Sequence, residues 1–183
     1  MKNLLFVGLV SFLAFAMSCS SNPCDDVVCL NDGYCANGEC VCPEGFAGAD
    51  CSKQQTPSKI QIDKIVITKF PATDGGAGWD LTSGADIFPQ LSFDGQIIYS
   101  PDEFYQDADP GSTYAFTPGS NTFIENPNGQ HSITLYDYDD FDADDFMGGI
   151  NFTPYTSDNK FPSLLNLDAG GSVAFELHLS YIF

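Results

Sequence analysis

The sequence predicts an all-β protein in which a small disulfide-rich module precedes an antiparallel β-sandwich. Six of the seven cysteines lie between Cys24 and Cys51, in a segment too short to bury a sufficient hydrophobic core, so cross-links must hold it together. After Ser58, short apolar runs are separated by turns rich in glycine, proline and asparagine. No segment there has the periodicity of an amphipathic helix. Short strands joined by such turns predict two packed antiparallel sheets.

The first residues are predicted to form a targeting segment that is not part of the fold. Lys2 supplies a positive charge, and the apolar stretch 4–16 is shorter than a membrane-spanning helix. Cleavage after Ala16 would suit an ordinary secretory peptidase. Residues 16–19, Ala-Met-Ser-Cys, instead resemble a bacterial lipobox, whose cysteine becomes a lipidated N-terminus. Seven cysteines leave one unpaired, and Cys19 stands outside the cluster that follows, which favours the lipobox.

We therefore expect a lipoprotein signal peptide over residues 1–18, lipidation of Cys19 and a tether over residues 19–23. These features predict an exported protein that is lipid-anchored at the outer membrane or the cell surface. Its contact with the membrane would be made through the N-terminal lipid.

The cysteine-rich module is expected over residues 24–51. Six cysteines allow many pairings, and their spacing alone does not choose among them. Residues 31–35 and 40–51 closely resemble an EGF-like domain, in which Gly45 and Gly48 fit the positive-φ turns of the last loop. The resemblance implies three disulfides: Cys24–Cys35, Cys29–Cys40 and Cys42–Cys51.

This module is predicted to act as a rigid spacer or a protein-contact surface. Calcium-binding EGF-like domains carry an acidic run before the first cysteine, where residues 20–23 of this chain read Ser-Ser-Asn-Pro, so we assign no calcium to it. A cysteine-rich zinc site is the alternative, but an exported protein reaches an oxidising compartment in which disulfides form. The polar, proline-containing residues 52–58 are expected to link the module to a second domain over residues 59–183.

The second domain is predicted to begin with a long strand whose inward face changes in the middle. Ile60 and Ile62 share one parity while Ile65 and Ile67 share the other, so we expect a bulge at residues 63–64.

Later strands are marked by alternation and by turn residues. Apolar runs on either side of Asp94-Gly95 predict two strands joined by a tight turn. Residues 121–125 and 132–137 flank an Asn-Pro-Asn-Gly segment, which predicts another hairpin-like connection. The last strand alternates cleanly, with an inward set of Val173, Phe175, Leu177, Leu179 and Tyr181.

Two groups of aspartates interrupt this pattern. The first spans residues 80–86 and the second residues 137–145. Carboxylates this close repel one another unless a cation neutralises them, and Ca²⁺ accepts six to eight oxygen ligands in flexible geometry. The alternative is a solvated acidic turn. An EF-hand does not fit, because Asp145 stands where that loop needs glycine and Asn151 where it needs a bidentate glutamate.

The second group resembles the third calcium loop of C2 domains, with Asp-Tyr-Asp at residues 137–139 and Asp-Phe-Met-Gly at residues 145–148. Asp80 and Asp86 resemble the first calcium loop of that family, although Ile-Phe-Pro follows in place of the usual Pro-Tyr-Val. The resemblance covers residues 59–183 and implies an eight-stranded antiparallel β-sandwich that binds Ca²⁺. The implied ligands are Asp80, Asp86, Asp137, Asp139 and Asp145, with Asp140, Asp142 and Asp144 contributing negative charge around them.

The charge balance limits the possible functions. The net charge is −19, with 25 acidic residues against six lysines, which excludes the basic footprint of a nucleic-acid-binding protein. His131 and His178 lie in no catalytic or metal-ligand motif, and no segment indicates a sugar cleft for paired catalytic acids, so we expect no enzyme.

We expect a calcium-binding, lipid-anchored surface protein that acts as a binding or adhesion module. Its ligand would be a lipid headgroup or an extracellular protein or glycan. The alternatives are a calcium-dependent binder of phospholipid or glycolipid, and a non-catalytic accessory subunit of an envelope complex.

Overall fold

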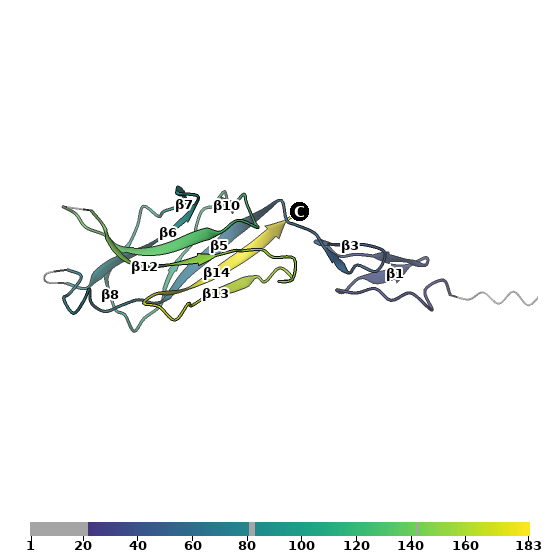
Figure 1. The fold of residues 1–183 in the computed structure, drawn as a ribbon, viewed down its shortest axis with the longest axis horizontal. Helices are drawn as coiled ribbons and strands as arrows, with labels where there is room; N and C mark the ends of the chain where they lie inside the picture. Colours follow the sequence, from purple (N-terminus) through teal and green to yellow (C-terminus); the bar gives the residue numbers. More distant parts are fainter. Residues whose placement is uncertain (1–21, 81–82, 142) are drawn as a thin grey trace, which may run out of the picture.

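The computed structural model describes residues 22–80, 83–141 and 143–183. The predicted signal peptide, Cys19 and residues 20–21 of the predicted tether lie outside the described residues, as do residues 81–82 and Asp142. The described residues form strands and turns without a helix, in agreement with the predicted all-β class (Figure 1). Among them there is accordingly no helix long and apolar enough to cross a membrane.

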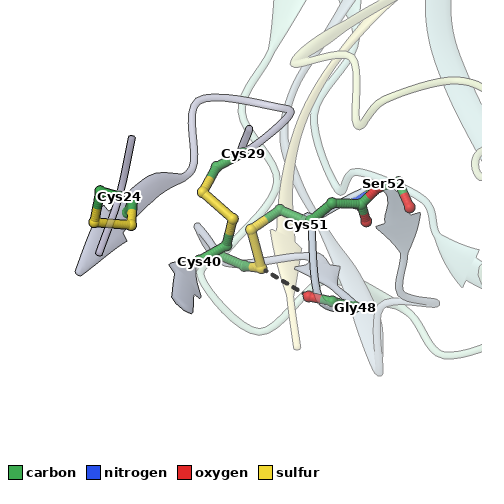
Figure 2. Close-up of a disulfide and its surroundings, with 9 residues drawn as sticks. Cys24, Cys29, Cys40, Gly48, Cys51 and Ser52 are labelled. Atoms are coloured by element: carbon green, nitrogen blue, oxygen red, sulfur yellow. Dashed lines mark hydrogen bonds between the residues drawn. A yellow bond between two sulfur atoms is a disulfide. The ribbon is translucent and has the colours of Figure 1, made fainter. Parts of the chain in front are cut away.

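The cysteine-rich module is built from two small antiparallel sheets. β1 (Tyr34–Ala36) pairs with β2 (Glu39–Val41), and β3 (Phe46–Ala47) pairs with β4 (Lys53–Gln54). β4 falls within residues 52–58, so this part of the expected linker belongs to a sheet of the module. The module's three disulfides have the pairing that the EGF-like resemblance implies: Cys24–Cys35, Cys29–Cys40 and Cys42–Cys51 (Figure 2).

The rest of the chain forms two sheets. One has the strand order β10-β5-β14-β13, with β9 also paired to β5, and the other has the order β12-β11-β6-β7, with β8 also paired to β6. The strands are β5 (Lys59–Lys69), β6 (Ala85–Phe93), β7 (Gln96–Tyr99), β8 (Tyr105–Ala108), β9 (Tyr114–Phe116), β10 (Phe123–Ile124), β11 (His131–Asp137), β12 (Asp145–Phe152), β13 (Leu164–Leu167) and β14 (Ala174–Ile182).

These strands occupy eight positions. β14 takes one side of β5 along its whole length, so β9 and β10 share the other side. In the same way β7 and β8 share the side of β6 that β11 leaves open. The described residues therefore form a sandwich with four strand positions in each sheet, which agrees with the predicted eight-stranded architecture.

The predicted bulge is present in β5. β14 pairs with Lys64 and with Ile62 but skips Asp63. The Asp63 carboxylate instead accepts a hydrogen bond of 2.6 Å from the Ser180 hydroxyl. The extra residue lets Ile62 and Ile65, on either side of it, both be fully buried in the core between the sheets.

The Asn-Pro-Asn-Gly segment does not form the hairpin-like connection that we predicted. β10 pairs with β5 in one sheet, whereas β11 pairs with β6 and β12 in the other. The chain therefore crosses between the sheets at this point. The Asp94-Gly95 turn does join two paired strands, β6 and β7, and both of its residues have positive φ, at 48° and 74°.

The small module contacts the sandwich at one end (Figure 1). The Tyr155 hydroxyl donates a 2.9 Å hydrogen bond to the Gln55 carbonyl. The Phe161 ring lies 5.4 Å from that of Phe46 in the module, and a Cβ on Gly45 would come within 2.6 Å of the Phe161 ring. Glycine is therefore required at this contact, where its φ is also positive, at 85°. The loops that carry the acidic residues lie at the opposite end of the sandwich (Figure 1).

Candidate metal centre

Asp137 is the last residue of β11 and its side chain is fully buried. Alternate residues of this strand face the core, namely His131, Ile133, Leu135 and Asp137. The same two-residue alternation that buries the apolar side chains therefore also buries the Asp137 carboxylate at the end of the sandwich. Its Oδ1 accepts a short hydrogen bond from the backbone N–H of Asp86. Its Oδ2 has no hydrogen-bond partner among the described residues.

Asp86 lies beside Asp137 because β6 is the neighbour of β11. The backbone N–H of Tyr138 donates to the Asp86 carbonyl at 2.8 Å, which continues the pairing past the end of β11. The Asp86 carboxylate accepts a 2.8 Å hydrogen bond from the N–H of Asp107, and the Asp107 carboxylate accepts one of 3.0 Å from the N–H of Gly84. Asp107 in β8 thus brings a third acidic segment to the site, one that the sequence analysis missed.

Burial and mutual repulsion disfavour the charged forms of both central carboxylates. The pKa of Asp137 is raised to about 6, mainly by burial and further by neighbouring carboxylates. The hydrogen bond from the Asp86 N–H acts in the opposite direction and lowers this pKa. Burial also raises the pKa of Asp86, against the hydrogen bond from Asp107, which lowers it. The charged groups that shift these two pKa values are all carboxylates: Asp80, Asp86, Asp107, Asp139 and Asp140.

The other predicted ligands lie around this pair at different depths. Asp80 is half-buried and accepts a 3.0 Å hydrogen bond from the Ser83 hydroxyl. Asp139 is also half-buried, and its backbone N–H donates to the Asp144 carboxylate at 3.2 Å. Asp145 is exposed at the start of β12, directly opposite the last residue of β11. The structure thus places Asp80, Asp86, Asp137 and Asp139 at one end of the sandwich, with Asp145 at the edge.

As they stand, no three carboxylate, histidine or cysteine groups within the described ranges converge closely enough to hold a metal ion. Unneutralised carboxylates repel one another, whereas a cation that takes six to eight oxygens would draw them inward. The donor set is oxygen alone, which suits hard cations such as Ca²⁺ better than zinc, whose usual sites contain nitrogen or sulfur ligands. Binding would therefore require these carboxylates to come closer together around the ion.

Aromatic side chains lie next to these carboxylates. The Phe104 ring stacks on that of Tyr138, with centroids 4.4 Å apart. Phe141, in the second acidic loop, is 100% exposed. An exposed ring of this size is available for contact with an apolar partner.

The EGF-like domain family model matches residues 19–51. No protein of curated function matches the chain. Solved structures similar to it include the first C2 domain (domain A) of plant Extended Synaptotagmin 1, with 14% identity and a TM-score of 0.40 over 70% of this chain and 97% of that one. The paired C2 domains (A and B) of Extended-Synaptotagmin 2, calcium bound, match with 18% identity and a TM-score of 0.33, over 68% of this chain and 45% of that one.

Human GIVD cytosolic phospholipase A2, in complex with an inhibitor and terbium chloride, matches with 13% identity and a TM-score of 0.38. That match covers 66% of this chain and only 17% of the phospholipase chain. At these identities and TM-scores the likeness carries no argument about function. An EGF-like domain model thus matches the N-terminal part of the chain. The solved structures similar to this all-β chain include C2 domains.

Proposed function

We propose that the sandwich binds Ca²⁺ at its acidic end, and that the chain is a lipid-anchored surface protein with a binding or adhesion role and no catalytic one. One observation carries the calcium proposal. Asp137 is fully buried, and its Oδ2 has no hydrogen-bond partner among the described residues.

A buried carboxylate oxygen without a partner is costly, by several kcal/mol for a charged group even after relaxation. Protonation would relieve the charge, but a pKa of about 6 leaves Asp137 mostly ionised at neutral pH. A cation satisfies the oxygen and removes the repulsion between neighbouring carboxylates in one step. We infer that Asp137 is the central ligand, with Asp86 beside it on β6 and Asp80 and Asp139 closing over the ion.

Asp145 is the outermost of the proposed ligands, since it is exposed at the start of β12. Asp107 is not proposed as a ligand. Its backbone N–H and its carboxylate hold Asp86 and Gly84 in place, so it acts as a positioning residue.

Calcium titration followed by calorimetric unfolding tests the proposal. Extracellular calcium modules often have a Kd near 10⁻⁴ M, so 1 mM calcium would add about 1.4 kcal/mol to the stability of the folded state. Asp137→Asn should abolish this gain. Asp158→Asn is the matched control, because it removes the same charge from an exposed residue in the loop between β12 and β13, away from the acidic loops. The absence of a calcium response in the native protein would disprove the assignment.

A second candidate, calcium-dependent binding of phospholipid headgroups, is favoured by Phe141. Its ring is fully exposed in an acidic loop, where bound calcium would let the loop approach an anionic surface. Co-sedimentation with vesicles of phosphatidylserine and phosphatidylcholine tests this idea. We expect chelator-sensitive binding that Phe141→Ala weakens. Calcium binding without any vesicle binding would disprove phospholipid binding and leave the adhesion role as the proposed function.

A further inference from the structure

The module and the sandwich meet at a joint that is built around one aromatic ring. The Phe161 ring packs against four other rings, with centroids 4.9–5.6 Å away, namely those of Phe46, Tyr155, Tyr181 and Phe183. Phe161 has a positive φ of 54°, which is unfavourable for a bulky residue. Such a conformation persists only where the surrounding contacts fix it.

Hydrogen bonds fix the polar segment that connects the two parts. The side-chain amide of Gln54 donates to the Thr156 carbonyl at 3.0 Å and accepts from the Lys160 N–H at 3.2 Å. The N–H and the hydroxyl of Ser58 both donate to the Ile182 carbonyl, at 2.7 and 2.8 Å. This part of the expected linker is therefore bonded to the sandwich at both of its ends. We expect the joint to be stiff, in contrast to a polar linker that lets two domains move.

The acidic loops lie at the end of the sandwich that is farthest from this joint (Figure 1). β5 starts beside the joint at Lys59, and its 11 residues span about 36 Å at about 3.3 Å per residue. Trp79 belongs to the far end, because its indole N–H donates to the carbonyl of Pro71, two residues after β5. Figure 1 shows the module continuing in the opposite direction, with its first described residues farthest from the sandwich.

The proposed lipid anchor therefore lies at the other end of an elongated chain. Cys19 is three residues from Asn22, the first described residue, so this span is at most about 11 Å whatever its conformation. That reach is far shorter than β5 alone. With a stiff joint, the tips of the acidic loops cannot turn back to the membrane that holds Cys19. The net charge of −19 also opposes a chain that lies flat on an anionic membrane surface.

We propose that the acidic end binds its partner on an opposing surface and not on the membrane to which the chain is anchored. This inference rests on the proposed function, since it combines the lipid at Cys19 with calcium at Asp137. The partner would present an anionic oxygen group that completes the coordination of the ion, beside an apolar group for the exposed Phe141. The joint then serves as a stiff spacer that keeps the acidic loops pointing away from the anchor.

Trp79 reports the height of the acidic end above the membrane, because it is the only tryptophan in the chain. The chain from Cys19 to Phe183 would be coupled to a maleimide lipid through Cys19, the one cysteine outside the three disulfides. The vesicles contain phosphatidylcholine, phosphatidylserine and a dansyl-labelled lipid, which accepts energy from tryptophan over distances shorter than the sandwich. At a vesicle dilution that prevents transfer between vesicles, we expect no transfer from Trp79, with or without calcium.

Two variants serve as controls for this measurement. Tyr34→Trp combined with Trp79→Phe moves the donor to a residue of β1 that is 63% exposed. This variant should show severalfold more transfer than the native chain in the same vesicles, because the module lies next to the anchor. Phe161→Ala should raise the transfer from Trp79, because the sandwich can then bend at the joint. Unchanged transfer in Phe161→Ala would contradict the role given to the joint.

Placing the dansyl-labelled lipid in a second population of phosphatidylserine vesicles, without protein, tests the opposing surface itself. Calcium-dependent transfer from Trp79 to this second population, without transfer to the anchoring vesicles, would support the proposal and identify a lipid surface as the partner. Calcium-dependent transfer from Trp79 to the anchoring vesicles would overturn the proposal. The chemical coupling does not depend on natural lipidation, and calorimetry measures calcium binding separately. Failure of this inference is therefore distinguishable from failure of the proposed function.

Discussion

Replacing Asp137 by asparagine should stabilise the calcium-free protein at neutral pH. Asparagine keeps the shape of the side chain and an oxygen that can accept from the Asp86 N–H. The pKa of Asp137 is raised from 3.8 to about 6, so the folded state disfavours the ionised carboxylate. A shift of about two units corresponds to about 3 kcal/mol, and solvent screening at the end of the sandwich reduces the expected gain to about 1–3 kcal/mol.

The gain must depend on pH with a definite sign. A carboxyl group whose folded pKa is raised binds more protons in the folded than in the unfolded state between about pH 4 and 6. Native stability, as far as it depends on Asp137, therefore increases as the pH falls through that window. The advantage of Asp137→Asn should be complete above about pH 6.5 and should disappear near pH 4.

Denaturant unfolding in the presence of a chelator, at several pH values across this range, measures the effect. Asp158→Asn, which removes one exposed carboxylate far from the site, controls for the general reduction of negative charge. An Asp137→Asn protein that is less stable than the native one at neutral pH would refute the reasoning. So would a gain of the same size at every pH.

Three further predictions concern the rest of the chain. Cys19→Ser should move the protein from the membrane to the soluble fraction even with calcium present, since the proposed lipid anchors it. Membrane retention that is lost only on chelation would show instead that calcium-dependent binding is the main attachment. Reduction should make residues 24–51 sensitive to protease while the sandwich, which contains no cysteine, keeps its calcium response; loss of both together would contradict separate stabilisation. Phe161→Ala should loosen the contact with Phe46 and lower the free energy of unfolding by about 1–2 kcal/mol at this half-buried site. NMR relaxation should then show that the module and the sandwich tumble more independently. Unchanged relaxation would show that the Phe161 ring is not needed for the contact.

Much of the sandwich could be predicted because strand periodicity records which side chains face the core. The change of parity between Ile62 and Ile65 indicated the bulge at Asp63 before any pairing was known. The crossing between β10 and β11 could not be predicted in the same way. Alternation and turn residues mark where strands end, but they do not record whether the next strand pairs in the same sheet or packs in the opposite one.

The clustered aspartates of the candidate site could be recognised in the sequence, and their role as ligands remains a prediction. Asp107 was missed because its acidic segment, residues 102–109, resembles neither calcium loop, and only the fold places its N–H on the Asp86 carboxylate. His131 lies in no catalytic or metal-ligand motif, and its side chain is buried in the structure. Its parity with Ile133 and Asp137 along β11 was the signal that it points inward.

The most direct test of the central claim is a crystal structure of the protein grown with millimolar calcium. We predict an ion at the acidic end, within about 2.3–2.6 Å of Oδ2 of Asp137 and bound as well by Asp86 and Asp139. A structure under these conditions with no ion there, and with Oδ2 of Asp137 paired to a protein donor or a water instead, would contradict the account.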